Sequence, residues 1–364
     1  MLLYRTWTSL VCLAAAVEAH LFQQRQASGD LAVSLAPASS GKATEIQATI
    51  TNTGVTDLSL LRLGTILDSG PVKKVTVINE DGVEVPFLGI ELSLHYEALQ
   101  LEHFESIPAK SSVTRVIDLA VAYDLEPGTY SIFAEGTFPA VSSQSTKAKT
   151  LTFKSEAIKV SIYESSTAEL KEKWSKRTIF QEEGCTAEQR EATLNGIRNC
   201  EPLARAAAAD AANVHSARFV EYFKSNETHA RKLVSGRLLA VAEECSATDS
   251  GETKVQCKDN WGYCESEGPL IAYTIWVSGY VTMCPLFYDT LPPLPQKCHK
   301  QDHATTTIHE MTHARAVYEE EVSTQDYAYG YENSTALDPV SCLYNADSYS
   351  LYANGWGGQG SRNV

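Results

Sequence analysis

The chain has 364 residues, 43% of them hydrophobic, which is enough to bury a sizeable core and to form two domains. Its formal net charge of −15 argues against a protein that binds a nucleic-acid backbone, because such proteins need clustered lysine and arginine. An acidic protein instead favours basic partners.

The first 19 residues have the three regions of a secretory signal peptide. Arg5 precedes an apolar run over residues 10–17, and a small residue, Ala19, stands at the expected cleavage site. That run is too short to span a bilayer, and no later stretch is long and apolar enough, so we expect a secreted, soluble protein without a membrane segment. Glycosylation acceptor triplets begin at Asn226 and Asn333, and they become relevant once the chain is exported.

Residues 20–177 are predicted to form an all-β region. Short runs of alternating polar and apolar residues are separated by turn residues, and strands of this length and spacing predict an antiparallel, sandwich-like domain. This part of the chain contains no catalytic cluster of its own. The expected strands are residues 43–50, 73–78, 112–117, 128–134 and 157–162.

A polar linker over residues 164–177 ends this region with the dibasic pair Lys176 and Arg177. A processing protease needs an exposed, flexible segment of this kind. We therefore expect residues 20–177 to be a propeptide that assists folding and blocks the active-site cleft. Cleavage after Arg177 would then leave residues 178–364 as the mature domain.

The second half is predicted to be α+β, mainly helical with a small sheet. Residues 187–199 and 203–223 are rich in strong helix formers, whereas residues 273–277 and 280–284 have the pattern of two strands. The prolines over residues 291–295 exclude a helix and a central strand, so this segment is expected to be a loop.

Nine cysteines are present, and Cys12 leaves with the signal peptide. The remaining cysteines lack the CxxC spacing of a zinc knuckle, and an even number in an exported chain indicates disulfides formed in an oxidising compartment. They are Cys185, Cys200, Cys245, Cys257, Cys264, Cys284, Cys298 and Cys342.

The segment over residues 305–318 carries a His-Glu-x-x-His pattern at His309, Glu310 and His313. Two histidines four residues apart lie on the same face of a helix, so both imidazoles can reach one Zn²⁺ ion. Glu310 then lies beside the metal, where it can act as general base toward a water molecule whose pKa zinc lowers. The pattern predicts one zinc ion per chain and metal-assisted hydrolysis.

The third protein ligand decides the class of zinc enzyme. A metzincin would have glycine and histidine where this chain has Ala316 and Glu319, so that class is excluded. A gluzincin would take a glutamate from a later helix, and Glu332 is the well-separated candidate. A carboxylate on the loop directly after the helix, Asp326, is the other option, and the spacing leaves both open.

The loop over residues 323–330 resembles the Gly-Thr-x-Asp-x-x-Tyr-Gly motif of the aspzincin metallopeptidases, the deuterolysin family. The resemblance implies that Asp326 is the third zinc ligand. It also implies that Tyr329 donates a hydrogen bond to the oxyanion of the tetrahedral intermediate. Ser323 stands where the motif has its first glycine, a residue that can serve a positive φ.

The order of signal peptide, long propeptide, dibasic junction, helical start and paired cysteines is similar to that of deuterolysin across most of residues 1–353. This resemblance implies a set of disulfides, with Cys200 and Cys245 left to pair with each other. The implied pairs are Cys185–Cys257, Cys264–Cys284 and Cys298–Cys342.

Residues 345–352 are similar to a segment in which related peptidyl-lysine endopeptidases place a substrate-binding aspartate. By that resemblance, Asp347 attracts a lysine or arginine side chain after the cleaved bond. Those enzymes have a second acidic residue three positions on, where this chain has Ser350. We therefore expect broad cleavage that favours basic proteins.

Together these features predict a secreted, monomeric zinc metalloendopeptidase that is made as an inactive precursor and acts on proteins or peptides. Two other classes of protein stay open. A secreted zinc-binding protein could keep the fold and the disulfides without catalysis. A structural zinc protein would need a fourth ligand that closes the site, such as His299 or His303.

Overall fold

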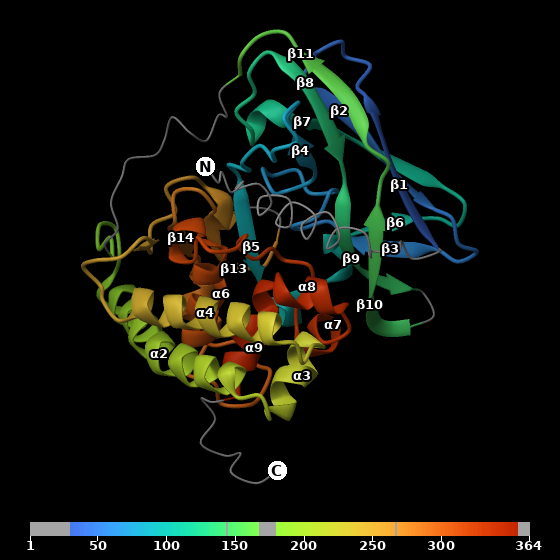
Figure 1. Ribbon diagram of the computed structural model, residues 1–364. Coiled ribbons are helices and arrows are strands. Elements are labelled where there is room, and N and C mark those ends of the chain that lie inside the picture. Colours follow the sequence, from blue (N-terminus) through green and yellow to red (C-terminus); the bar gives the residue numbers. More distant parts are fainter. Residues whose placement is uncertain (1–29, 143–144, 167–179, 266–267, 356–364) are drawn as a thin grey trace, which may run out of the picture.

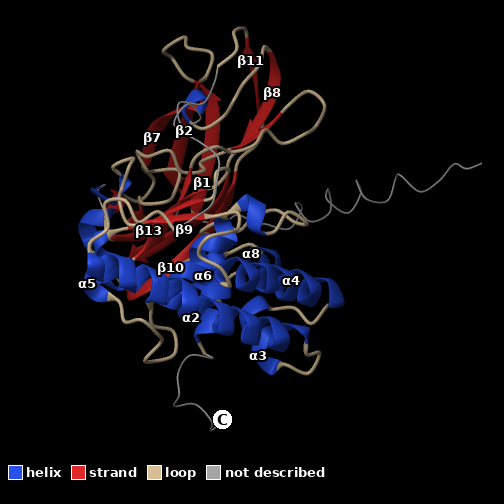
Figure 2. Cartoon of the chain, turned by 90° about the vertical axis from the view of Figure 1, so that its left-hand side faces the viewer, coloured by secondary structure: helices blue, strands red, loops and turns tan. Residues whose placement is uncertain are grey.

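The computed structural model describes residues 30–142, 145–166, 180–265 and 268–355. Within these ranges the chain is α+β, with most strands gathered in one half of the molecule and the helices in the other (Figures 1 and 2). The expected signal peptide and the Lys176–Arg177 pair lie outside the described residues.

The N-terminal half contains three small sheets whose neighbouring strands are antiparallel. The first sheet has the strand order β1 (Leu31–Pro37), β2 (Glu45–Asn52) and β7 (Ser112–Asp118). The second has the order β10 (Ser145–Lys154), β9 (Glu135–Ser142), β3 (Leu58–Leu61) and β6 (Phe104–Ile107). The third has the order β11 (Ile158–Ile162), β8 (Gly128–Phe133) and β4 (Thr76–Ile78). Alternate residues of β2, among them Ile46 and Ile50, face a core that the sheets share. The expected β-rich region is present, with all but one of its strands divided among three sheets.

The helical half begins with the long helix α2 (Ala187–Ala212). Thr186 and Gln189 form a capping box at its start, in which each side chain accepts a hydrogen bond from the other residue's backbone. The sequence predicted a break near residue 200, but α2 continues through Pro202, and the separate α3 (Ala217–Phe223) follows. The other helices are α4 (Thr228–Cys245), α5 (Pro285–Thr290), α6 (His303–His313), α7 (Tyr331–Ser334), α8 (Pro339–Leu343) and α9 (Ala346–Asn354).

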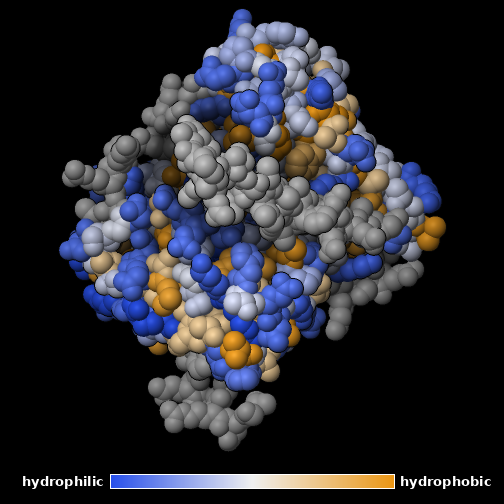
Figure 3. Space-filling model, viewed as in Figure 1, coloured by the Kyte–Doolittle hydropathy of each residue, from blue (hydrophilic) through white to orange (hydrophobic). Residues whose placement is uncertain are grey.

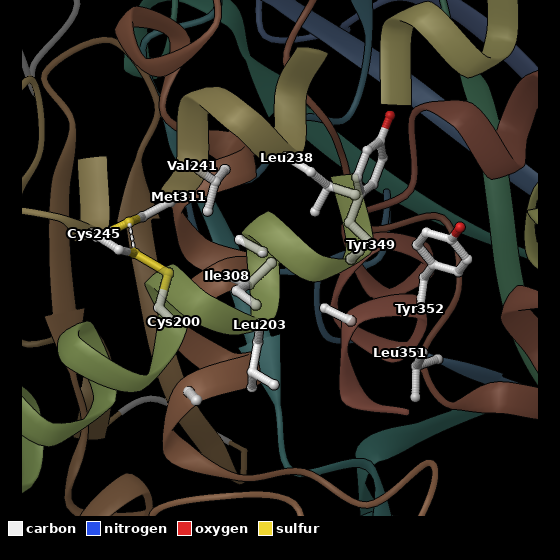
Figure 4. Packing of buried hydrophobic residues seen from close by; sticks show 14 of the residues in the cluster. Cys200, Leu203, Leu238, Val241, Cys245, Ile308, Met311, Tyr349, Leu351 and Tyr352 are labelled. Carbon is white, nitrogen blue, oxygen red and sulfur yellow. Dashed lines mark hydrogen bonds between the residues drawn. A yellow bond between two sulfur atoms is a disulfide. The ribbon is translucent and has the colours of Figure 1, made fainter. Parts of the chain in front are cut away.

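Helix α6 lies inside the helical half, and all of its residues are buried. Ile308 and Met311 pack into the hydrophobic core beside α2 and α4, which the Cys200–Cys245 disulfide ties together (Figure 4). Full burial of a side chain such as isoleucine or methionine contributes about 1.5–3 kcal/mol. The helix is therefore held in a fixed position by its own apolar residues.

Helix α6 also contacts a four-stranded sheet with the order β12 (Lys254–Gln256), β14 (Tyr280–Met283), β13 (Leu270–Ile275) and β5 (Ile90–Leu94). Strand β5 comes from the N-terminal half and pairs antiparallel with β13, so one half extends the sheet of the other (Figure 1). A hydrophobic cluster at this junction joins Leu61 and Leu94 to Leu270 and Tyr273. The sequence predicted β13 and β14, but not β5.

Three of the four expected cysteine pairs are bonded, namely Cys185–Cys257, Cys200–Cys245 and Cys264–Cys284. The fourth expected pair is corrected by the structure, because Cys298 and Cys342 are both free. The Cys342 thiol is buried and donates to the carbonyls of Ser334 and Leu337, whereas Cys298 is exposed. Burial raises the pKa of the Cys342 thiol to about 12.

The outer surface is ordinary for a globular chain. On the face shown in Figure 3, hydrophilic residues cover much of the helical half, and the hydrophobic patches between them are small. Exposed large hydrophobic residues are scattered, among them Val55, Leu101 and Tyr163. None of the described helices is long and apolar enough to cross a membrane.

Candidate active site

Helix α6 carries the His-Glu-x-x-His pattern. Asp302 caps its N-terminus and accepts hydrogen bonds from the Thr305 N–H at 3.0 Å and the Thr305 hydroxyl at 2.5 Å. His309 and His313 follow one turn apart on the same face, and the helix ends at His313. Their exposed fractions are 2% and 0%, so the two rings are held by packing as well as by the helix.

The two rings meet the carboxylate of Asp326. Nε2 of His309 lies 3.1 Å from Nε2 of His313. The Asp326 carboxylate lies 3.2 Å from the first of these nitrogens and 3.3 Å from the second. One ligand atom from each residue lies within 4.8 Å of the others, an arrangement that could hold a metal ion.

The hydrogen bonds around the two rings show why these atoms suit a cation. Nδ1 of His309 donates to Oδ1 of Asp347 at 3.0 Å, and Nδ1 of His313 donates to the Thr324 carbonyl at 3.0 Å. A neutral imidazole that donates from Nδ1 has a lone pair on Nε2. Both lone pairs face Asp326, whose two oxygens are buried without a hydrogen-bond donor. A divalent cation satisfies all of these atoms at once.

The electrostatics of the three side chains also favour positive charge. Burial lowers the pKa of His309, but the neighbouring Asp326 carboxylate outweighs burial and raises that pKa well above its ordinary value. Burial raises the pKa of Asp326, but the two imidazoles outweigh it and hold that pKa well below its usual range. A buried position that stabilises positive charge so strongly is suited to a cation.

The loop after α6 brings Asp326 back to the end of the helix. The Thr324 N–H donates to the Thr312 carbonyl at 3.2 Å, and the hydroxyls of these two threonines lie 2.7 Å apart. The Gln325 N–H donates to the Tyr344 carbonyl at 2.8 Å. The two residues before Asp326 are therefore fixed, one by the helix and the other by the segment before α9.

The first and last residues of the loop motif, Ser323 and Gly330, differ in backbone conformation. Ser323, which replaces the first glycine, is not among the residues with positive φ, so serine fits this turn. Gly330 has a φ of 75°, which glycine adopts at low cost, and its N–H donates to Asp347 at 2.6 Å. Arg237, which is 1% exposed, donates to the Leu343 carbonyl at the end of α8 at 3.2 Å.

Glu310 lies between the two histidines in sequence and points toward the sheet. It is fully buried, and its Oε2 accepts a hydrogen bond from the Thr274 hydroxyl on β13 at 2.6 Å. Its Oε1 has no hydrogen-bond partner in the part of the chain that the structure describes. Burial raises the pKa of Glu310, while the two imidazoles and Thr274 act in the opposite direction. With one oxygen held and the other unpaired, this carboxylate can accept a proton.

Tyr329 is 5% exposed, and its hydroxyl donates to the Leu92 carbonyl on β5 at 2.7 Å. Burial raises the pKa of this phenol well above its ordinary value, so it stays protonated and able to donate at neutral pH. The resemblance implied that Tyr329 donates to the oxyanion of the tetrahedral intermediate. In the structure, Tyr329 instead donates to a backbone carbonyl of the N-terminal half.

Asp347 has contacts that the resemblance did not imply. It is 4% exposed, and its two oxygens accept hydrogen bonds from the His309 ring and the Gly330 N–H. The Ser350 hydroxyl donates to the Asp347 carbonyl at 3.2 Å. Both carboxylate oxygens are thus engaged within the site's scaffold, which argues against the expected contact with a basic substrate side chain.

The alternative metal ligands lie elsewhere. Glu332 is exposed on α7. The His299 ring lies 2.8 Å from the Tyr222 hydroxyl, and Nε2 of His303 lies 2.9 Å from the Phe287 carbonyl. Within the described ranges, His309, His313 and Asp326 form the one His, Cys, Asp or Glu cluster with metal-ligand geometry.

Three residues near the site were not anticipated. Thr274 holds Glu310, and the Thr324 carbonyl orients the His313 ring. Glu91 on β5 lines the same cavity of about 40 Å³ as Asp326, and burial raises the pKa of Glu91 to about 8. Thr324 is the threonine of the loop motif, and Thr274 is the one threonine in the run that forms β13, so both have a signal in the sequence.

The model of the deuterolysin metalloprotease (M35) family matches residues 3–362 of the chain. The chain belongs to this family. The neutral protease 2 homolog of Botryotinia fuckeliana is 39% identical over 319 residues, covering 86% of this chain and 88% of that protein. The homolog of Sclerotinia sclerotiorum is 38% identical over 335 residues, 91% of each protein. Neutral protease 2 of Aspergillus oryzae is 36% identical over 313 residues, 85% of this chain and 87% of that protein.

Membership of the M35 family confirms the resemblance that the loop over residues 323–330 suggested. It makes the chain an enzyme, a zinc metalloendopeptidase that hydrolyses peptide bonds. The family match includes the β-rich half as well as the helical half, so the contact between β5 and β13 joins two parts of the same M35 sequence.

Proposed function

We propose that this chain is the precursor of a secreted M35 endopeptidase in which His309, His313 and Asp326 hold one Zn²⁺ ion. The observation that carries the proposal is the convergence of two Nε2 lone pairs on a buried carboxylate that has no hydrogen-bond donor. Zinc bound there supplies the Lewis acidity that makes water nucleophilic near neutral pH.

Glu310 is the general base in this proposal. Its unpaired oxygen accepts a proton from the attacking water and then donates that proton to the leaving amine. Thr274 holds the other oxygen and so fixes the direction of the carboxylate. Tyr329 donates its hydroxyl hydrogen to the substrate oxygen that becomes negatively charged, as it now donates to the Leu92 carbonyl.

We further propose that residues 20–177 are a propeptide that blocks the cleft. Strand β5 supports this, because it occupies the edge of the sheet beside α6, where an extended substrate could otherwise pair with β13. The Tyr329 hydroxyl is engaged by β5, and a hydrophobic cluster covers the junction. Cleavage after Arg177 by a processing protease then frees the cleft.

A precursor that carries Lys176→Ala and Arg177→Ala tests the cleavage step. After incubation with a dibasic-specific protease, we expect the parent chain to yield a fragment of residues 178–364 that hydrolyses casein. The variant is expected to stay intact and inactive. Maturation of the variant at the same bond would contradict the proposed processing site.

Zinc content tests the third ligand. The cleaved enzyme is expected to retain about one zinc per chain after dialysis. Asp326→Ala is expected to lose this zinc, whereas Glu332→Ala retains it, because Glu332 is exposed on α7. Loss of zinc in the Glu332 variant alone would favour the gluzincin alternative.

We also propose that the enzyme acts outside the cell as a monomer and prefers basic substrates. The full chain has a net charge of −15, and residues 178–364 contain 25 acidic and 14 basic side chains, so the cleaved enzyme also attracts cationic chains. Its disulfides are stable in oxidising compartments. Comparing kcat/KM for protamine and casein at low and high salt tests the preference. We expect protamine to be favoured at low salt and this advantage to shrink as salt screens the charges. Equal kcat/KM values for protamine and casein at every salt concentration would contradict the preference for basic substrates.

A further inference from the structure

Helix α4 carries a buried arginine beside the loop that holds Asp326. Arg237 is 1% exposed and belongs to the largest fully buried side chains of the described residues. Its guanidinium carbon lies 5.5, 5.7 and 5.2 Å from the ring centroids of Tyr318, Tyr344 and Tyr349. Aromatic faces stabilise a cation that burial has removed from water. Because burying an unpaired charge is costly, the acceptors of its N–H groups fix where this side chain lies.

The guanidinium of Arg237 joins two segments that are distant in sequence. Nη2 donates to the Val322 carbonyl, directly before the loop over residues 323–330. Nη1 donates to the Leu343 carbonyl at 3.2 Å and to the Tyr349 hydroxyl at 2.9 Å. The Tyr349 hydroxyl in turn donates to the Leu343 carbonyl at 2.7 Å. A planar fork of donors therefore connects the start of the loop to the end of α8.

The segment after Val322 provides one candidate ligand and orients another. The Thr324 carbonyl accepts a hydrogen bond from Nδ1 of His313 at 3.0 Å. Asp326 follows two residues later, and its carboxylate lies 3.2 Å and 3.3 Å from the Nε2 atoms of the two histidines. A change in the path of the chain at Val322 therefore moves both groups.

The segment after Leu343 orients the remaining ligand and holds the loop from its other side. The Asn345 side chain accepts hydrogen bonds from the backbone N–H groups of the two residues after Asp326, both at 2.9 Å. Asp347 accepts a hydrogen bond from Nδ1 of His309 at 3.0 Å. The positions of all three candidate ligands therefore depend on how the two segments are spaced.

We propose that Arg237 is a positioning residue of the metal site, which fixes the spacing of the two segments by joining the Val322 and Leu343 carbonyls. This inference rests on the proposed function, in which His309, His313 and Asp326 share one metal ion. Groups that orient metal ligands affect metal affinity although they do not bind the metal. Lysine cannot replace this arginine, because an ammonium is a compact point charge without the planar fork.

The test uses the full-length chain with Lys176→Ala and Arg177→Ala, so that it stays uncleaved, loaded with Co²⁺ in place of zinc. Arg237→Lys keeps the positive charge but removes the fork. Tyr349→Phe is the milder variant, because it leaves the guanidinium in place and removes one hydroxyl that contacts it. The visible cobalt spectrum, the cobalt affinity against a competing chelator and the free energy of unfolding without metal are recorded for each chain.

Arg231→Lys is the matched control. Arg231 also lies on α4, is 4% exposed and has its guanidinium carbon 4.3 Å from the ring centroid of Phe219. It likewise donates to backbone carbonyls, those of Ala211 at 3.2 Å and Asn213 at 2.7 Å. These acceptors belong to the end of α2 and not to the segments around the metal site. The control therefore makes the same substitution in the same kind of buried contact at another place.

We expect Arg237→Lys to change the cobalt spectrum and to bind cobalt about tenfold or more weakly than the parent. Tyr349→Phe is expected to change both measurements in the same direction by a smaller factor. Arg231→Lys is expected to lower the free energy of unfolding but to match the parent in cobalt spectrum and affinity.

A purely structural role for Arg237 would lower the free energy of unfolding in both arginine variants and leave cobalt binding unchanged, and this result would overturn the proposal. If Arg237→Lys does not fold, Tyr349→Phe decides, and a Tyr349→Phe chain that matches the parent in cobalt binding overturns the proposal.

Casein hydrolysis by the cleaved parent, measured in parallel, separates this inference from the proposed function. If the cleaved parent is active while the Arg237 and Tyr349 variants bind cobalt as the parent does, the Arg237 proposal alone fails. If these variants change cobalt binding while the cleaved parent is inactive, the proposed function fails and the positioning role stands. A parent chain that binds no cobalt would contradict both.

Discussion

Replacing Asp347 by asparagine separates the two roles that this carboxylate could have. In the structure its oxygens accept hydrogen bonds from His309 Nδ1 and from the Gly330 N–H. An asparagine amide has one acceptor oxygen, so one of these donors loses its acceptor whichever way the amide turns. A hydrogen bond to a charged group contributes about 1.5–3 kcal/mol. Loss of a partner that orients a ligating histidine weakens metal binding about 10–100-fold, or about 1.4–2.8 kcal/mol.

We therefore expect the cleaved Asp347→Asn enzyme to bind zinc about 10–100-fold more weakly than wild type in competition with a chelator. At saturating zinc, kcat/KM is then measured for two peptides that differ only in having lysine or leucine after the cut. The kcat/KM values for the two peptides are expected to change by the same factor. Asp338→Asn is the control, because this carboxylate caps α8 by accepting from the Val340 and Ser341 N–H groups. Unchanged zinc affinity with a loss confined to the lysine peptide would refute this reasoning and favour substrate binding.

In the cleaved enzyme, Tyr329→Phe is expected to lower kcat about 10²–10³-fold on a chromogenic peptide with zinc content unchanged, and an effect on KM alone would contradict a transition-state role. Asp302→Asn keeps the cap of α6 but removes a carboxyl whose pKa burial raises to about 7. Because the unfolded carboxyl ionises near pH 4, wild-type stability falls as pH rises from about 4 to about 7, by about 4 kcal/mol at most. The free energy of unfolding, measured with a denaturant, is expected to depend less on pH in the variant than in wild type. The same pH dependence in both proteins would contradict this pKa. Cys298 is expected to react with a thiol reagent in the folded chain and Cys342 only after unfolding, and a Cys298–Cys342 disulfide in a non-reducing peptide map would contradict it.

Local patterns made much of the fold predictable. The alternation along β2 directs Ile46 and Ile50 inward, and it is visible in the sequence as regular spacing. The spacing of His309 and His313 places both rings on one face of a helix. The third ligand needed more than spacing, because Asp326 is on a loop and the spacing left Glu332 possible as well, although its segment is rich in glycine and tyrosine. Only the resemblance to the deuterolysin loop favoured Asp326.

Contacts between distant segments were not predictable. The run Ile90–Leu94 alternates apolar and polar residues, which is typical of a strand with one face exposed to solvent, but all five residues of β5 are buried. Its partner β13 lies in the other half of the chain, and no local pattern records that pairing. A glutamate in such a run gives no sign that it lines the same cavity as Asp326. The resemblance identified Asp347 and Cys342 as residues of interest, but it did not predict their contacts, because those contacts also join distant segments.

The central claim is that Glu310 acts as a base beside a metal that it does not bind. It is tested most directly by comparing cleaved wild type with Glu310→Gln for casein hydrolysis and for bound zinc. Glutamine keeps the size of the side chain and can still accept the Thr274 hydrogen bond, but it cannot take up the proton. We predict that hydrolysis falls about 10²–10⁴-fold while zinc content stays the same. Undiminished hydrolysis, or loss of zinc together with activity, would contradict this role.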